Sequence, residues 1–135
     1  NELESKSHIG LINARVGRQA PELLKVIRHD KEKMQDSKTV LDLGNNNRLT
    51  IQEIEDIFNE LKDQPLVIVV NTAVPRAWRE QNNQLIADAA KNYSNIRIVD
   101  WAQKSVNHPE YFAPDGVHLI PAGIAAYVSA IREYL

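Results

Sequence analysis

The sequence predicts an α/β fold in which helices cover both faces of a parallel sheet. Segments with strand character alternate with segments of helical periodicity along the chain. The strand segments are short, continuous apolar runs, and such runs are typical of parallel strands buried on both faces. In folds of this kind ligands bind beyond the carboxyl ends of the strands, so the loops that follow the strands are where we expect a site.

The composition favours one soluble globular domain spanning residues 1–135. The length is sufficient to bury a core, and 43% of the residues are hydrophobic while 25% are charged. A net charge of −2 gives no reason to expect a nucleic-acid partner. Cysteine is absent, which excludes disulfides, Cys nucleophiles and Cys-ligated zinc.

The first half of the chain predicts two strands and one helix. Residues 8–14 are expected to form a short strand. Residues 20–34 carry apolar side chains at roughly helical spacing, with Pro21 in the first turn, where proline is tolerated. Residues 39–43 are apolar and partly β-branched, which predicts a buried strand, and the glycine and asparagines that follow predict a turn.

The middle of the chain predicts a capped helix followed by the clearest strand. Thr50 and Glu53 have the spacing of a capping box at a helix start. The expected inner face of that helix is Ile51, Ile54, Ile57, Phe58 and Leu61. Residues 66–70, Leu-Val-Ile-Val-Val, then predict a buried strand.

The last half of the chain continues the alternation. A loop is expected at 71–79, a helix at 80–93, a strand at 96–99 and an irregular segment at 104–112. Pro121 opens a closing helix that runs to the C-terminus. Its expected inner face is Ile124, Tyr127, Val128 and Ile131.

The segment just before the closing helix holds the clearest candidate for chemistry. Asp115 and His118 are three positions apart, and Pro114 and Gly116 favour a turn. A carboxylate that orients an imidazole forms two parts of a nucleophilic triad, in which the imidazole takes the proton of a Ser, Thr or Cys. The alternative is a surface turn with a solvated Asp and a half-buried His, because such pairs also occur by chance.

Five motifs in order resemble the SGNH hydrolases, also called the GDSL esterase/lipase superfamily. They are Val16-Gly17-Arg18-Gln19, Leu43-Gly44-Asn45-Asn46, residues 70–78, Val99-Asp100-Trp101 and residues 111–119. Within the superfamily the chain is most similar to the extracellular C-terminal domain of Gram-positive peptidoglycan O-acetyltransferases. The resemblance implies a three-layer α/β/α, flavodoxin-like fold.

The resemblance also implies roles for individual residues. His118 would be the general base and Asp115 its orienting carboxylate. Gly17, through its backbone N–H, and Asn46, through its side-chain amide, would form the oxyanion hole; otherwise they are ordinary loop and turn residues. Losing one preorganised oxyanion donor typically costs about 10²–10³ in rate.

The loop at 71–79 resembles the segment that flanks the acceptor in these transferases. Val74, Arg76 and Trp78 would bind substrate there, although a packing role for Trp78 is an equal alternative. Trp101 is expected to belong to the core. No His, Asp and Glu residues have the spacing of a metal site, and the resemblance implies neither a metal nor a cofactor.

The sequence departs from the family pattern at its start, because the Gly-Asp-Ser block that supplies the nucleophile is absent. We assign none of the six serines as the nucleophile, and the chain as given is expected to be inactive without it. In the strand order 2-1-3-4-5 the first strand is central. We therefore expect a gap between the strands at 9–14 and 39–43, which upstream sequence, a swapped partner or a second chain fragment would fill.

The expected function of the intact parent is acetyl transfer by a Ser-His-Asp double displacement to the C6 hydroxyl of N-acetylmuramic acid. Its partners would be an acetyl donor, a peptidoglycan glycan acceptor and an integral-membrane acyltransferase domain, at the outer face of a Gram-positive cell membrane or in its wall. One alternative is a related esterase that hands the acetyl group to water. Another is a catalytically dead carbohydrate-binding relic.

Overall fold

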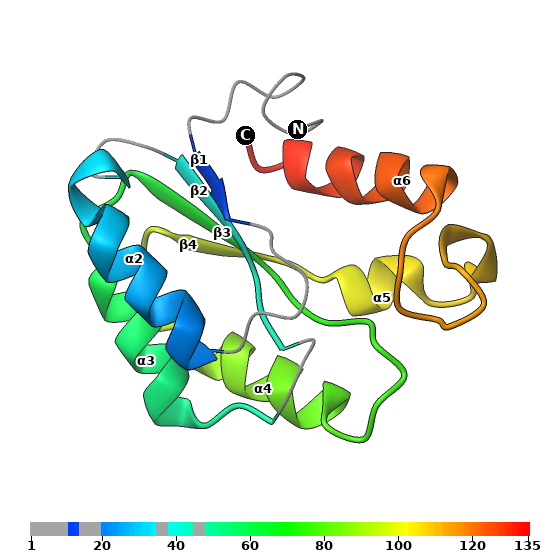
Figure 1. The fold of residues 1–135 in the computed structure, drawn as a ribbon, viewed down its shortest axis with the longest axis horizontal. Coiled ribbons are helices and arrows are strands. Elements are labelled where there is room, and N and C mark those ends of the chain that lie inside the picture. The colour runs from blue at the N-terminus through cyan, green and yellow to red at the C-terminus, as the bar shows by residue number, and fades with distance from the viewer. Residues whose placement is uncertain (1–10, 14–19, 35–37, 45–47) are drawn as a thin grey trace.

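Four parallel strands form the centre of the computed structural model, which describes residues 11–13, 20–34, 38–44 and 48–135. The strands are β1 (Leu11–Asn13), β2 (Lys38–Asp42), β3 (Leu66–Val70) and β4 (Ile96–Val99), in the spatial order β1-β2-β3-β4. Since every neighbouring pair is parallel, the carboxyl ends of all four strands lie at one edge of the sheet (Figure 1).

The prediction of a gap between the strands at 9–14 and 39–43 is wrong. β1 pairs directly with β2, with Leu11 opposite Thr39 and Asn13 opposite Leu41. Buried backbone N–H and C=O groups need partners, and this direct pairing supplies them without an intervening strand. No further strand, whether from upstream sequence, a swapped partner or a second fragment, is therefore required between β1 and β2. The order of the remaining strands agrees with the prediction.

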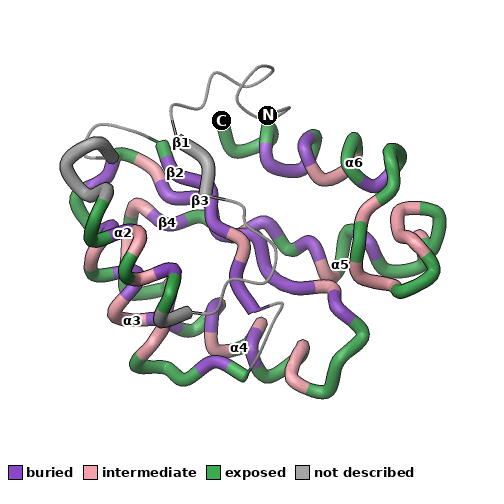
Figure 2. Tube along the Cα trace, in the orientation of Figure 1, coloured by how far each residue is buried: buried purple, intermediate pink, exposed green. Residues whose placement is uncertain are grey.

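The expected three layers are present. The longer helices α2 (Ala20–Met34), α3 (Ile51–Glu60) and α4 (Arg79–Ala90) cover one face of the sheet, and α6 (Pro121–Arg132) covers the other (Figure 1). Alternate residues of β3 enter the two cores: Val67 and Val69 face α3 and α4, while Ile68 and Val70 face α6. The central strands are buried along most of their length, as the purple tube in Figure 2 shows.

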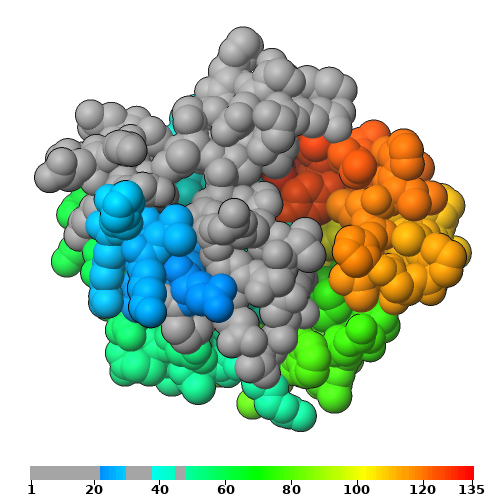
Figure 3. All heavy atoms as spheres, viewed as in Figure 1, coloured from blue at the N-terminus to red at the C-terminus, as the bar shows by residue number. Residues whose placement is uncertain are grey.

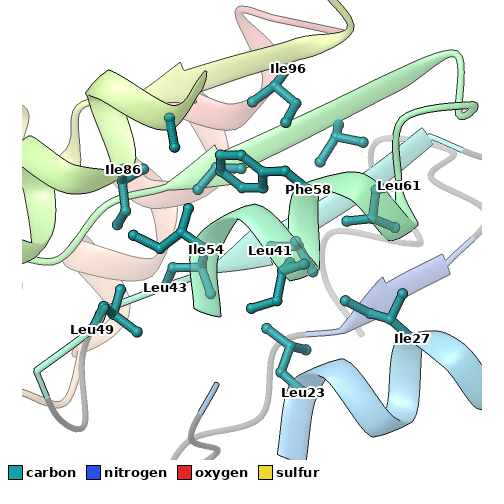
Figure 4. Close-up of a cluster of buried hydrophobic side chains, with 14 residues drawn as sticks. Leu23, Ile27, Leu41, Leu43, Leu49, Ile54, Phe58, Leu61, Ile86 and Ile96 are labelled. Atoms are coloured by element: carbon teal, nitrogen blue, oxygen red, sulfur yellow. The ribbon is translucent and has the colours of Figure 1, made fainter. Parts of the chain in front are cut away.

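The larger core forms around α3, whose start follows the predicted capping box. Thr50 accepts a hydrogen bond from the Glu53 N–H at 3.1 Å, and Glu53 Oε1 accepts one from the Thr50 N–H at 2.9 Å. Phe58 is fully buried at the centre of the cluster (Figure 4). Ile51 was predicted to face inward but is 43% exposed. It occupies the first helical position, where it lies on the solvent side of the apolar stripe formed by the fully buried residues Ile54, Ile57, Phe58 and Leu61.

Two short helical segments precede α6. The helix α5 (Trp101–Ser105), which the sequence analysis did not predict, follows directly on β4, and the single 3-10 turn η1 (Pro109–Tyr111) lies in the segment expected to be irregular. Trp101 is 5% exposed and belongs to the core, as predicted. In α6, Val128 and Ile131 are buried as expected, but Ile124 is 38% exposed, which corrects its predicted inward position.

Among the residues that the structure describes, no helix is both long and apolar enough to span a bilayer.

Candidate active site

Asp115 and His118 lie on a closed turn between η1 and α6. Phe112 and Leu119 form an antiparallel bridge at its base. Inside it, the Ala113 N–H donates to the His118 carbonyl at 2.8 Å and the Gly116 N–H to the Ala113 carbonyl at 2.9 Å. These hydrogen bonds hold the backbone of residues 113–118 in one conformation. The Asp115 and His118 side chains therefore extend from an ordered turn.

The Asp115 carboxylate is directly hydrogen-bonded to His118. Its Oδ2 contacts the imidazole Nδ1, and its Oδ1 accepts the backbone N–H groups of Val117 at 2.8 Å and His118 at 3.0 Å. The bond to the imidazole and then the two backbone bonds lower the pKa of Asp115 from 3.8 to about 2. A carboxylate only accepts hydrogen bonds, so Nδ1 carries the proton and the His118 Nε2 is left as the basic nitrogen.

The turn rests on the loop that follows β3. Gly116 has φ +72°, a conformation that favours glycine, and a Cβ at this position would lie 3.2 Å from Pro75 Cγ. The tip that carries Asp115 and His118 therefore contacts the 71–78 loop. Figure 3 shows both segments on the same side of the molecule, the turn in orange and the region around residue 80 in green.

Polar side chains at the carboxyl ends of β3 and β4 meet as the sequence predicted. Asn71 Nδ2 donates to Asp100 Oδ1 at 3.0 Å, and Asn71 Oδ1 accepts the Ala102 N–H at 3.0 Å. Asp100 also caps α5 by accepting the Gln103 N–H at 3.2 Å. This network joins the start of the 71–78 loop to the start of α5.

Two consecutive asparagines of α4 hold the loops that follow β2 and β3, a role that the sequence analysis missed. Asn82, fully buried, donates to the Gly44 carbonyl at 3.1 Å and accepts the Leu49 N–H at 2.8 Å. Asn83 accepts the Thr72 N–H and donates to the Thr72 carbonyl, both at 2.9 Å. The available signal was a pair of amides in the first turn of a helix beside the predicted ligand-binding edge.

The other predicted site residues have varied positions. Val74 is 6% exposed, so its side chain packs inside the loop, whereas Arg76 is exposed and donates to the Pro75 carbonyl at 3.3 Å. Trp78 is half-buried, and its Nε1 is buried with no hydrogen-bond partner among the described residues. Gly17 and Asn46 lie outside the described residues, so the oxyanion-hole prediction stays a prediction.

Aromatic packing supports the base of the turn. Trp101 stacks on Tyr111 with 5.9 Å between ring centroids and meets Tyr127 edge-on at 5.2 Å. Gly123 of α6 packs so closely on η1 that a Cβ would lie 2.1 Å from the Tyr111 carbonyl oxygen. The first contact packs η1, just before the turn, against the core on the α6 side of the sheet, and the second packs η1 against α6 itself.

The described side chains around the turn can carry out proton transfer. No group of three or more His, Asp or Glu residues that could hold a metal ion occurs in the described part of the chain. Ser105 is buried and donates to the Trp101 carbonyl at 2.6 Å, which gives it a structural partner. The His118 and Asp115 side chains are 63% and 45% exposed, so a substrate and a nucleophile can reach the imidazole. The arrangement can act as a general base and then as a general acid.

Comparison with curated proteins identifies similar chains in Gram-positive bacteria, although no protein-family model matches this chain. A Staphylococcus aureus protein, provisionally named an O-acetyltransferase, is 38% identical over 92% of this chain and 21% of its own length. The peptidoglycan O-acetyltransferase OatA of Listeria monocytogenes is 37% identical over 92% of this chain and 20% of its own length. Bacillus subtilis YrhL, provisionally named a peptidoglycan O-acetyltransferase, is 36% identical over 90% of this chain and 19% of its own length.

The chain thus spans about a fifth of the length of the curated relatives it matches. These comparisons confirm the resemblance predicted from the motifs: over nine tenths of its length, this chain is similar to one segment of the peptidoglycan O-acetyltransferases.

Proposed function

We propose that this chain is the acetyl-transferring domain of a peptidoglycan O-acetyltransferase of the SGNH type. The observation that carries the proposal is the hydrogen bond between Asp115 and the Nδ1 of His118, on a turn that contacts the loop after β3. This is the orientation in which an imidazole presents its second nitrogen to a nucleophile. The names of the similar proteins supply the chemistry, since they describe O-acetyl transfer to peptidoglycan.

The proposed reaction is a double displacement. His118 Nε2 takes the proton of a serine hydroxyl as its oxygen attacks the acetyl carbonyl, and the carbonyl electrons move onto oxygen. When that oxyanion collapses, the bond to the donor breaks and the leaving group takes the proton from His118. The acceptor hydroxyl then repeats both steps on the acetyl-serine, which releases the serine and leaves the acetyl group on the acceptor. Asp115 stabilises the imidazolium in each half-reaction.

The serine of this scheme is not assigned to any of the six serines in the sequence. We infer that it precedes residue 1 in the native protein, in a Gly-Asp-Ser block. Gly17 and Asn46 are proposed to donate hydrogen bonds to the oxyanion, through a backbone N–H and a side-chain amide respectively. Asn82 would support the second of these by holding Gly44 and Leu49, on either side of the segment that contains Asn46.

The proposed acceptor is the C6 hydroxyl of N-acetylmuramic acid, with Arg76 and Trp78 on the loop beside it. Because the similar proteins are about five times as long as the matched segment, we infer that the parent also carries an integral-membrane acyltransferase domain that delivers acetyl groups. The catalytic domain would then act at the outer face of the cell membrane, on the cell wall.

The test is acetyl transfer by the intact protein from an activated acetyl ester to solubilised glycan strands, with the products analysed by mass spectrometry. Acetyl-glycan that carries the group on the muramic acid C6 oxygen is the expected product, and a His118→Ala variant should form at least about 10³-fold less per unit time. Exposed Ser129→Ala on α6 is the matched control and should retain activity. Release of free acetate alone, with no acetyl-glycan, would refute transfer and identify an esterase.

A further inference from the structure

A groove of about 860 Å³ lies next to the turn that carries Asp115 and His118. Its lining residues come from α4, from Ile98 of β4 and from the segment between α5 and η1. Pro75 and Gly116 both line it, and these are the residues through which the turn contacts the 71–78 loop. Gly116, the residue after Asp115 in the sequence, thus lines the groove, although Asp115 and His118 do not. The volume of the groove is in the range of ligand-binding clefts.

The groove offers uncharged hydrogen-bonding groups. Gln84 of α4 and Gln103 of α5 are exposed and line it, and the exposed Asn107 lines it as well. Among the described residues no hydrogen bond engages the side chains of Gln103 or Asn107, and Gln84 uses only its Nε2, donated to Asp88 at 3.0 Å. Amides both donate and accept, which suits ligands rich in hydroxyl and acetamido groups.

The charges of the lining disfavour an anionic ligand. Arg79 is the one Lys or Arg among the described residues that line the groove, and Glu80 and Asp100 line it as well. Phosphate and nucleic-acid sites instead gather several cations. The lining thus fits a neutral, polar ligand better than a phosphorylated one.

A rigid stack of rings ends at one wall of the groove. The His108 imidazole lies flat on Tyr111, with 4.5 Å between centroids and 8° between planes, and Tyr111 stacks in turn on the buried Trp101. Glu110 holds the His108 Nδ1 at 2.8 Å, so the outer ring is fixed in orientation. His108 and Phe112 thus place ring surface beside the amides, and a ring face accommodates the apolar face of a sugar.

We propose that this groove binds the sugars of the acceptor strand that neighbour the sugar receiving the acetyl group. The inference rests on the proposed function, because the reacting sugar must lie at His118. A polymer whose reacting unit lies there continues past Gly116 and Pro75 into the groove. There its hydroxyl and acetamido groups meet Gln84 and Gln103, and a sugar ring covers His108 or Phe112.

The test compares a short and a long acceptor in the intact protein: the disaccharide and the octasaccharide of peptidoglycan glycan strands, both stripped of peptide. A Gln84→Ala/Gln103→Ala variant removes two hydrogen-bonding side chains from the groove. It should lower kcat/KM for the octasaccharide about tenfold and leave the disaccharide value within about twofold. Equal losses on both acceptors, or no loss on either, would overturn the proposal.

The chain contains a matched control for the structural cost of the Gln84→Ala part of this variant. Gln52 on α3 donates to Asp56 four residues later at 2.8 Å, as Gln84 donates to Asp88, and both glutamines are exposed. Gln52 does not line the groove. Gln52→Ala should therefore cost the same small helix-surface interaction while leaving kcat/KM for both acceptors unchanged.

A binding titration distinguishes failure of this inference from failure of the proposed function. Octasaccharide added to ¹⁵N-labelled protein should shift the side-chain amide signals of Gln84 and Gln103 but not that of Gln52. If these signals shift and no acetyl is transferred, the proposed function fails and the groove assignment stands. If acetyl is transferred while these signals stay unchanged, the groove assignment fails and the proposed function stands.

Discussion

At the scale of single residues, the account depends on Asp115 acting through His118. Asp115→Asn would present an amide to Nδ1 and remove the carboxylate that stabilises the imidazolium. In the serine-protease triad this change lowers kcat by about 10⁴, and we expect a loss of 10³–10⁴ here. The measurement is kcat for acetyl transfer. Asp63→Asn, at an exposed carboxylate just after α3, should change kcat less than twofold, and a similar loss in both variants would contradict the triad assignment.

The low pKa of Asp115 predicts how this interaction responds to pH. Because the folded-state pKa is about 2 and the ordinary value is 3.8, ionised Asp115 favours the folded state above pH 4. That contribution is lost as the pH falls from 3.8 towards 2. The ¹³C shift of the Asp115 carboxyl should titrate near 2, and in His118→Ala its midpoint should move up towards 3.8. An unchanged midpoint in the variant would exclude the imidazole as the main cause of the shift.

The segment from Asp100 to Leu119 shows at this scale what the sequence could and could not predict. The turn at Asp115 was predictable because Pro114 and Gly116 act locally. The contact between Gly116 and Pro75 was not predictable, because it joins loops about forty residues apart. The burial of Val74 was not predictable either, nor were the two hydrogen bonds between the Asn83 side chain and the Thr72 backbone. Both depend on tertiary packing that no local pattern encodes.

At the scale of elements, α4 is expected to stabilise the site through Asn82. Asn82→Ala would leave the buried Leu49 N–H and the Gly44 carbonyl without these partners, at a cost of about 2–4 kcal/mol in the free energy of unfolding. Urea denaturation measures this loss. Asn92→Ala, at an exposed asparagine just past the end of the same helix, should cost less than about 0.5 kcal/mol. Equal unfolding free energies for the two variants would show that the Asn82 hydrogen bonds to Gly44 and Leu49 do not stabilise the fold.

The packing of α6 on η1 gives a second prediction at this scale. Gly123→Ala would place a Cβ 2.1 Å from the Tyr111 carbonyl oxygen, so the helix or the turn must move. We expect a loss of about 1–3 kcal/mol in unfolding free energy, together with reduced acetyl transfer because the displaced segment leads into the turn of His118. Ala125→Ser, exposed on the same helix, should change neither quantity. Thermal unfolding and the transfer assay check both, and a stable, fully active Gly123→Ala would contradict the packing.

The elements themselves were largely predictable where the pattern was local and strong. The run Leu66–Val70 and the Thr50–Glu53 capping box both appear as predicted. The helix α5 was missed because its five residues are too few to display a period, although Asp100 is a cap residue. Ile51 and Ile124 were placed on inner faces by spacing alone, and the final rotation of each helix against its neighbours exposes them instead.

At the scale of the whole molecule, the parallel sheet brings the loops after β3 and β4 to one edge. The turn of His118, which precedes α6, contacts the loop after β3 at that edge, so residues far apart in the sequence form one surface. The direct pairing of β1 with β2 could not be predicted, because a strand pattern carries no information on which strand lies beside it. The family resemblance predicted a gap there, and backbone pairing in this chain closes it.

The most direct test of the central claim is an intact-mass spectrum of the purified native protein after brief incubation with p-nitrophenyl acetate. The account predicts an adduct of one acetyl group on a serine, formed in the wild type and lost in His118→Ala. It also predicts that adding glycan strands discharges the adduct onto sugar. No adduct in the wild type, or equal adduct in both proteins, would contradict acetyl transfer through His118.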